Sequence, residues 1–324
     1  MLQTTATPVA PDDFLKANVE FGERAVFYPL GFPVEIFSNT TDLIEGAAHY
    51  WGPFSQSFDE PPIRLNLGVT PEDGGDLPPK PTFRTHENLL AIVSDGRNFI
   101  ICDFSRHHAF GWLTRAVARN VRFAGYHFLT GAGMSLLVSR HLAPVHGALV
   151  AKNSRGVLLC GDSGAGKSTL AYACARAGWN YISDDGAYLL RYHQGCFGSG
   201  NPFTMHLRED AARLFPELAG RVPSVRPGGK IGFEVDTRDL PIVLATRSSI
   251  DHVVFLHRQN GATSSMEPLD HEEVIAWCER WARLGEEHVR AAQRQTYRRL
   301  LAAQTWRMHY PDVNAAIPLL EQLS

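Results

Sequence analysis

The sequence predicts an α/β protein in which a buried strand, a glycine-rich loop and a helix follow one another without interruption. Residues 157–160 (VLLC) form a short apolar run that is typical of a buried strand. Residues 169–177 are rich in alanine, which favours a helix, and Gly178 follows where helices commonly end. The intervening residues 161–168, GDSGAGKS, fit the pattern G-x-x-x-x-G-K-[ST]. Strand, loop and helix therefore occur in the order that a phosphate-binding P-loop requires.

This loop predicts a site for the phosphates of a nucleotide. Glycines allow backbone N–H groups to surround a polyphosphate, and the N-terminus of the following helix adds partial positive charge. Lys167 is expected to reach the outer phosphates, and the Ser168 hydroxyl is expected to bind Mg²⁺. The alternative is a glycine-rich turn that happens to carry a lysine. The predicted nucleotide-binding residues are Gly161, Asp162, Ser163, Gly164, Ala165, Gly166, Lys167, Ser168 and Thr169.

The composition indicates a soluble protein with a proper core. The 324 residues are 44% hydrophobic and carry a formal net charge of −3, which gives no argument for nucleic acid or an anionic membrane as partner. No apolar run reaches the length of a membrane span, and the first residues lack the regions of a signal peptide. Five scattered cysteines without a C-x-x-C pair suit a reducing compartment. We therefore expect a cytoplasmic protein that binds neither nucleic acid nor membrane.

Three regions are predicted along the chain. Residues 1–140 alternate short strands and helices around a proline-rich loop and carry no chemical motif, which indicates an α+β domain. Residues 141–260 contain the P-loop and form the predicted core, with residues 250–256 as its last strand. Residues 261–324 are expected to be helical, with one long helix over 270–301.

A hairpin is predicted to bring His146 to the phosphate loop. Only a short connection separates the strand at 146–150 from the strand at 157–160, and this is too short for a parallel crossover. If Lys152 pairs with Val157, His146 lies opposite Ser163. A catalytic role and a structural role for this histidine are both open at this point.

Two aspartates follow the strand predicted at residues 179–183. Ligands gather at the carboxyl ends of strands in open α/β sheets, so Asp184 and Asp185 should face the phosphates. One of them can help to hold Mg²⁺, and the other can accept a proton from an attacking hydroxyl. The alternative is a pair of solvated turn residues.

Together these segments resemble HPr kinase/phosphorylase. The likeness covers about residues 141–256, and the 18 positions between Lys167 and Asp185 match the spacing of that family. The resemblance implies a P-loop core of the HPr kinase C-terminal domain and phosphoenolpyruvate carboxykinase type, with ATP and Mg²⁺ as cofactors and a serine hydroxyl as acceptor. It also implies that Asp185 is the general base, that His146 assists it, and that Ser168 and Asp184 bind the metal.

A basic loop adds to the resemblance. Residues 225–230, VRPGGK, look like the V-R-P-G-R-N segment of the family, which is implicated there in phosphorolysis. The likeness implies that Arg226 and Lys230 bind the substrate. The residues alone leave open whether this loop clamps an anion or is an exposed turn.

The chain also departs from the family pattern. Thr169 stands where the family usually has Glu, the E-[IV]-R-G signature is not found, and residues 1–140 do not resemble the regulatory domain of the HPr-specific enzymes. We therefore expect a divergent HPr-kinase-related serine kinase that acts on a protein or peptide other than HPr. The alternatives are a nucleotide-binding regulator and a small-molecule kinase. Reversal by phosphorolysis and assembly into a homo-oligomer stay open.

Overall fold

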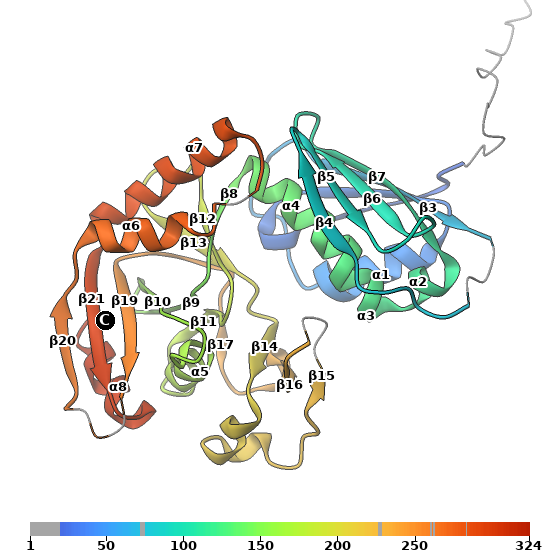
Figure 1. Cartoon of the computed structure of the whole chain (residues 1–324). Helices are drawn as coiled ribbons and strands as arrows, with labels where there is room; N and C mark the ends of the chain where they lie inside the picture. Colours follow the sequence, from blue (N-terminus) through green and yellow to red (C-terminus); the bar gives the residue numbers. More distant parts are fainter. Residues whose placement is uncertain (1–19, 72–74, 226–228, 260, 262, 283) are drawn as a thin grey trace, which may run out of the picture.

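The computed structural model describes residues 20–324 apart from 72–74, 226–228, 260, 262 and 283. The described chain is mixed α/β and has two halves, each built on a sheet of seven strands (Figure 1). Helix α4 (Gly131–Arg140) ends the first half, and the strand β8 (Leu142–Val145) begins the second.

The sheet of the first half has helices on one face. Its order is β1 (Glu23–Phe27), β2 (Val34–Ser38), β3 (Ile63–Thr70), β7 (His108–Thr114), β6 (Phe99–Asp103), β5 (Leu89–Val93) and β4 (Thr82–His86). Strands β2, β3 and β7 run parallel, and the remaining pairs are antiparallel. The helical segments are α1 (Thr41–Trp51), α2 (Arg115–Arg119), α3 (Val121–Phe123), the π-helix Ala124–Thr130 and α4.

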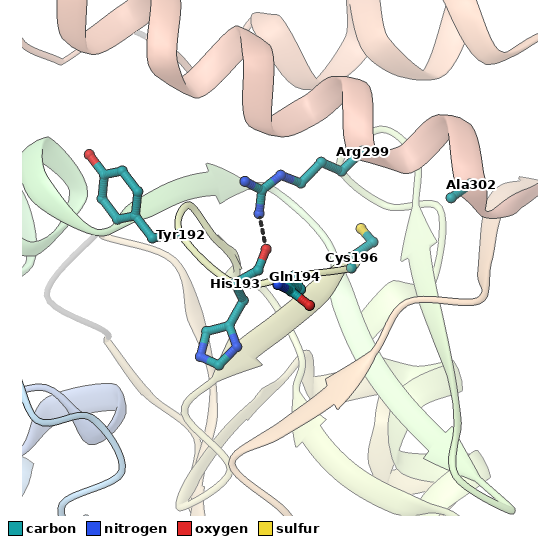
Figure 2. A pocket seen from close by; sticks show the side chains of 7 residues that line it. Tyr192, His193, Gln194, Cys196, Arg299 and Ala302 are labelled. Carbon is teal, nitrogen blue, oxygen red and sulfur yellow. Dashed lines mark hydrogen bonds between the residues drawn. The ribbon is translucent and has the colours of Figure 1, made fainter.

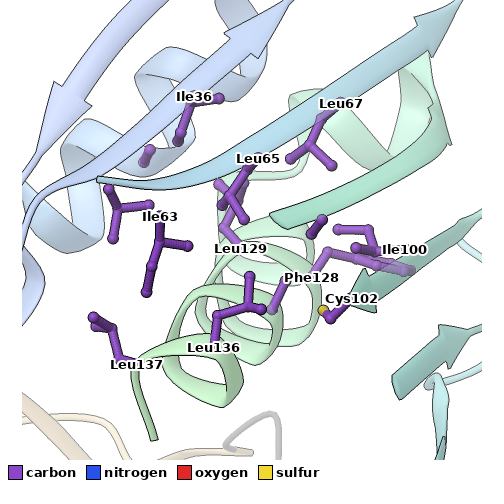
Figure 3. Packing of buried hydrophobic residues seen from close by; sticks show 14 of the residues in the cluster. Ile36, Ile63, Leu65, Leu67, Ile100, Cys102, Phe128, Leu129, Leu136 and Leu137 are labelled. Atoms are coloured by element: carbon purple, nitrogen blue, oxygen red, sulfur yellow. The ribbon is translucent and has the colours of Figure 1, made fainter. Parts of the chain in front are cut away.

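Buried apolar and exposed polar side chains alternate along the strands, and the buried ones form the core of this half. In β3 the side chains of Ile63, Leu65 and Leu67 are buried, whereas Arg64 is exposed. Figure 3 shows these apolar side chains meeting the helices, among them Phe128 of the π-helix. Burial of one face of the sheet against the helices accounts for the fold of this half.

The sheet of the second half carries the predicted loop. Its order is β17 (Val243–Leu244), β11 (Asn180–Ser183), β9 (Ala148–Lys152), β10 (Arg155–Cys160), β19 (His252–Arg258), β21 (Gln304–Tyr310) and β20 (Ser265–Pro268). Helices α5 (Lys167–Arg176) and α8 (Val313–Glu321) pack on one face, and α6 (His271–Glu279) and α7 (Glu287–Tyr297) lie toward the other. Strand β10 is apolar on both faces because both are covered.

Two smaller sheets complete this half. One has the order β18 (Arg247–Ser249), β13 (Phe197–Gly200), β12 (Ala187–Leu190) and β8. The other consists of β14 (Thr204–Leu207), β16 (Ile231–Asp236) and β15 (Ser224–Val225), and it lies close to the first half (Figure 1). Within the described part of the chain, no helix is both long and apolar enough to cross a bilayer.

The predicted antiparallel hairpin is confirmed, but its register differs. Lys152 pairs with Arg155 rather than with Val157, and Val150 lies opposite Val157. The turn consists of Asn153 and Ser154 alone, both with positive φ (50° and 65°), as a tight two-residue hairpin requires. The predicted pairing of His146 with Ser163 was therefore wrong by two residues.

The predictions for the C-terminal region need two corrections. Residues 261–324 are not only helical, because β20 and β21 belong to the core sheet, and β21 runs parallel to β19. Residues 250–256 are therefore not the last core strand. The long helix predicted over 270–301 is interrupted between α6 and α7, where Gly285 adopts a φ of +88° that interrupts a right-handed helix.

Candidate phosphate-transfer site

The glycine-rich loop connects β10 directly to α5, as the sequence predicts. Gly161, Gly164 and Gly166 have φ values of 141°, 96° and 97°, a region that glycine enters without steric cost. The Tyr310 hydroxyl, at the end of β21, donates a hydrogen bond of 2.6 Å to the carbonyl of Ala165. A Cβ on Gly166 would lie 2.8 Å from that hydroxyl, so glycine is also needed here for close approach. Strand β21, the last strand of this sheet in chain order, thus anchors the loop.

Lys167 points into the loop. Its Nζ donates to the carbonyl oxygens of Gly161 (2.8 Å) and Asp162 (3.2 Å), and the residue is buried. Burial lowers the pKa of Lys167, although the nearby carboxylate of Asp185 opposes this shift. The ammonium is therefore held in the hollow of the loop, where anionic phosphates would compensate its charge.

Ser168 and Asp184, the two predicted metal ligands, are hydrogen-bonded to each other. The Ser168 hydroxyl donates to the backbone carbonyl of Asp184 (3.3 Å), and one oxygen of the Asp184 carboxylate accepts from the backbone N–H of His206 (2.9 Å). Asp184 is buried, and burial raises the pKa of its carboxyl. A cation beside this carboxylate would offset that cost.

The donor set fits Mg²⁺ better than a metal held by protein alone. Among the residues that the structure describes, no three His, Cys, Asp or Glu side chains gather as a metal site. Mg²⁺ usually keeps several waters and binds one or two protein oxygens together with substrate phosphates. One hydroxyl and one carboxylate next to a phosphate loop meet that requirement.

His146 and Asp185 lie together beside the loop. His146 Nδ1 is 3.2 Å from Asp185 Oδ1 and 3.2 Å from the Asp185 backbone oxygen. The Asp185 side chain is 56% exposed, so a substrate can reach its carboxylate. The structure therefore brings the two predicted residues into contact, although the predicted hairpin register was wrong, and their roles stay predictions.

The surroundings of His146 favour its neutral form. Its ring lies 4.8 Å from Trp281 and 6.4 Å from Trp277, measured between ring centroids. Burial lowers the pKa of His146, and the charges of Lys167 and Lys230 lower it further, against the opposing effect of Asp185. A neutral imidazole can donate its Nδ1–H to the Asp185 carboxylate and hold it in one orientation.

The basic loop is only partly described. Arg226 lies outside the described residues, so its predicted role in binding the substrate stays a prediction. Lys230 is exposed, and its charge acts on His146 and on Lys167. Lys230 is therefore close enough for its charge to act on both of these residues.

Sequence reasoning missed two cations near the site. A Cβ on Gly164 would lie 3.6 Å from Arg208 Nη2, so this guanidinium borders the phosphate loop. A Cβ on Gly229 would lie 3.6 Å from Nζ of Lys80, which comes from the first half of the chain. Neither residue belongs to a local pattern, and only the folded chain brings them to the loops.

A separate hollow lies at the hairpin that joins β12 and β13. Its volume is about 540 Å³, and Figure 2 shows its lining of Tyr192, His193, Gln194, Gly195, Cys196, Arg299 and Ala302. The Arg299 guanidinium donates to the backbone carbonyls of His193 and Leu190 and thereby fastens the hairpin. None of the predicted site residues lines this hollow.

Comparison with known proteins agrees with the resemblance. No family model matches the chain. A segment of 97 residues is 34% identical to HPr kinase/phosphorylase from Mycoplasmopsis pulmonis (strain UAB CTIP). Over this segment the chain is related in sequence to HPr kinase/phosphorylase. The match covers 29% of the chain and 31% of the relative, so the chain spans about a third of the curated protein it matches.

A solved structure, that of the HPr(Ser) kinase/phosphatase from Coxiella burnetii, also matches the chain. It shares 14% sequence identity with a TM-score of 0.28, and the match covers 56% of this chain and 91% of the other. A likeness this distant carries no argument for the site.

Proposed function

We propose that the chain is an ATP- and Mg²⁺-dependent kinase that transfers the terminal phosphate to a serine hydroxyl of a protein or peptide. The observation that carries this proposal is the position of an exposed carboxylate, Asp185, beside a phosphate loop that contains Lys167. A regulator that only changes conformation when a nucleotide binds needs no general base at this position. The sequence relationship to HPr kinase/phosphorylase supports the same chemistry.

Each residue would have a defined task in the transfer. The serine oxygen attacks the terminal phosphorus, its proton passes to the Asp185 carboxylate, and the bond between that phosphorus and ADP breaks. His146 holds the carboxylate through its Nδ1–H, and Lys167 neutralises charge on the phosphates. Ser168 and Asp184 would hold Mg²⁺, which supplies further charge neutralisation when bound.

We also propose a division of labour along the chain. Residues 141–260 would form the kinase core, completed by the strands in 261–324, and residues 1–140 would take part in docking the acceptor. Lys230, with Arg226, would hold the phosphorylated serine. The protein would act in the cytoplasm.

The test is a transfer assay with the purified chain, ATP and Mg²⁺. HPr, free serine and peptides encoded beside its gene are offered separately, and products are identified by mass spectrometry. We expect phosphoserine on a peptide or protein other than HPr, and loss of the product with Asp185→Asn. Efficient modification of HPr would overturn the choice of acceptor. Modification of free serine alone would identify a small-molecule kinase, and ATP binding without any transfer would favour a nucleotide-dependent regulator.

A further inference from the structure

The first half of the chain contacts the small sheet that borders the transfer site. Arg122, on α3 of the first half, forms an ion pair of 3.1 Å with Glu234 on β16. The rings of Phe54 and Phe203 meet edge to face with their centroids 4.9 Å apart. Tyr188 of β12 packs against the hydrophobic core of the first half. These contacts fix residues of the first half at the edge of the site.

The π-helix Ala124–Thr130 presents an aromatic side chain toward this edge. Tyr126 is 43% exposed. Burial raises the pKa of Tyr188 to about 12, and the charges of Asp185 and Tyr126 act in the same direction. The Tyr188 hydroxyl lies next to the segment that follows Asp185, 3.7 Å from the place of a Cβ on Gly186. π-Helical turns recur at functional sites. Tyr188 thus joins the core of the first half to the segment that follows Asp185.

Lysines from both halves converge at the same place. Lys80 reaches Gly229, the residue before Lys230, and the charge of Lys230 acts on His146 and Lys167. In the described part of the chain the lysine with a carboxylate partner is Lys152, whereas Lys80 and Lys230 have none. Both ammonium groups are exposed, pair with no carboxylate among the described residues, and lie at the loop that carries Lys230.

We propose that the first half supplies Lys80 to the acceptor side of the site, and that the acceptor is a peptide with acidic side chains next to its serine. This inference rests on the proposed function, because it assigns the acceptor of that reaction. Unpaired lysines attract a carboxylate and repel a basic peptide, so they select by charge. Tyr126, whose side chain is exposed, provides an aromatic surface that an extended peptide can pack against.

The experiment measures binding to the full chain by fluorescence anisotropy. Three fluorescein-labelled peptides share one sequence around a single serine, and the flanking positions carry Asp and Glu, Asn and Gln, or Lys. We expect the acidic peptide to bind most tightly and the lysine peptide most weakly at low salt, with the difference shrinking as salt is added. An exposed ion pair changes affinity by about two- to fivefold, so Lys80→Ala should weaken the acidic peptide by roughly that factor and Lys80→Glu by about four- to twentyfold.

Arg106→Ala is the matched control. It removes one exposed cation from the turn between β6 and β7, at the opposite end of the same sheet from Lys80. We expect it to leave all three affinities unchanged. Melting curves of each variant show whether the fold is retained.

Equal affinities for the three peptides, or equal effects of the Lys80 and Arg106 variants, would overturn the inference. Weaker ATP binding in Lys80→Glu with unchanged peptide binding would also overturn it, because Lys80 would then serve the nucleotide. The two proposals fail separately. Lys80-dependent peptide binding without phosphate transfer would overturn the proposed kinase activity and support the docking site. Phosphate transfer without a preference for acidic peptides would support the kinase activity and overturn the docking site.

Discussion

Replacing Asp185 with Asn tests the assignment of the general base. The Asp185 side chain is 56% exposed, so the amide meets no burial cost, and its oxygen can still accept a hydrogen bond from His146 Nδ1. The fold and the nucleotide affinity should therefore be kept. The amide cannot take the proton of the attacking hydroxyl, and loss of a general base typically slows transfer by about 10²–10⁴-fold. Single-turnover transfer from labelled ATP measures this step directly.

The control for this variant is Glu23→Gln, which removes a negative charge from an exposed residue of β1, an edge strand of the first sheet. It should leave the transfer rate within about twofold of the wild type, as surface substitutions away from a site usually have small effects. A wild-type rate in Asp185→Asn would refute the assignment. A lost rate with lost ATP binding would show that Asp185 supports the nucleotide instead.

Four further changes have defined outcomes. Lys167→Ala removes a charge-assisted phosphate contact worth about 1.5–3 kcal/mol, so calorimetry should show ATP affinity reduced at least roughly tenfold. His146→Ala should slow transfer while the melting temperature stays close to that of the wild type; a large melting drop with normal activity per folded molecule would make His146 structural. Asp184→Asn should raise the Mg²⁺ concentration needed for half-maximal transfer, and an unchanged requirement would remove Asp184 from the metal site. Burial lowers the pKa of His141 from 6.5 to about 3. Below pH 6.5 the unfolded chain therefore binds a proton at His141 that the folded chain does not bind, and the free energy of unfolding should fall by about 2 kcal/mol between pH 7 and pH 5. In denaturant titrations, His141→Gln should lose this part of the pH dependence.

Local patterns in the sequence predicted the centre of the fold correctly. The strand before the loop, the loop and helix α5 each depend on neighbouring residues, so composition and spacing were enough. The short connection was enough to predict the hairpin. It was not enough to predict the register of the hairpin, because the choice between a two-residue and a longer turn depends on the backbone angles of Asn153 and Ser154.

The features that the sequence did not predict involve residues whose spatial neighbours are distant in the sequence. Strand β21 alternates buried residues such as Met308 and Tyr310 with polar ones, and its polar content hid a core strand in a region that otherwise favours helix. Lys80 and Arg208 belong to no motif, and their position beside the loops follows from tertiary packing alone. The roles of Asp185 and His146 remain predictions, although the structure places the two side chains together.

The hydrogen bond between Tyr310 and Ala165 has a consequence for biosynthesis. The two residues are 145 positions apart, and Tyr310 stands 14 residues before the end of the sequence given. During translation the phosphate loop is made long before the strand that holds it in shape. The loop can acquire its final conformation only after β21 has left the ribosome, so nascent chains truncated before Tyr310 should be poor nucleotide binders even where the P-loop sequence is complete. Nucleotide capture would then follow the synthesis of β21 rather than the synthesis of the loop itself.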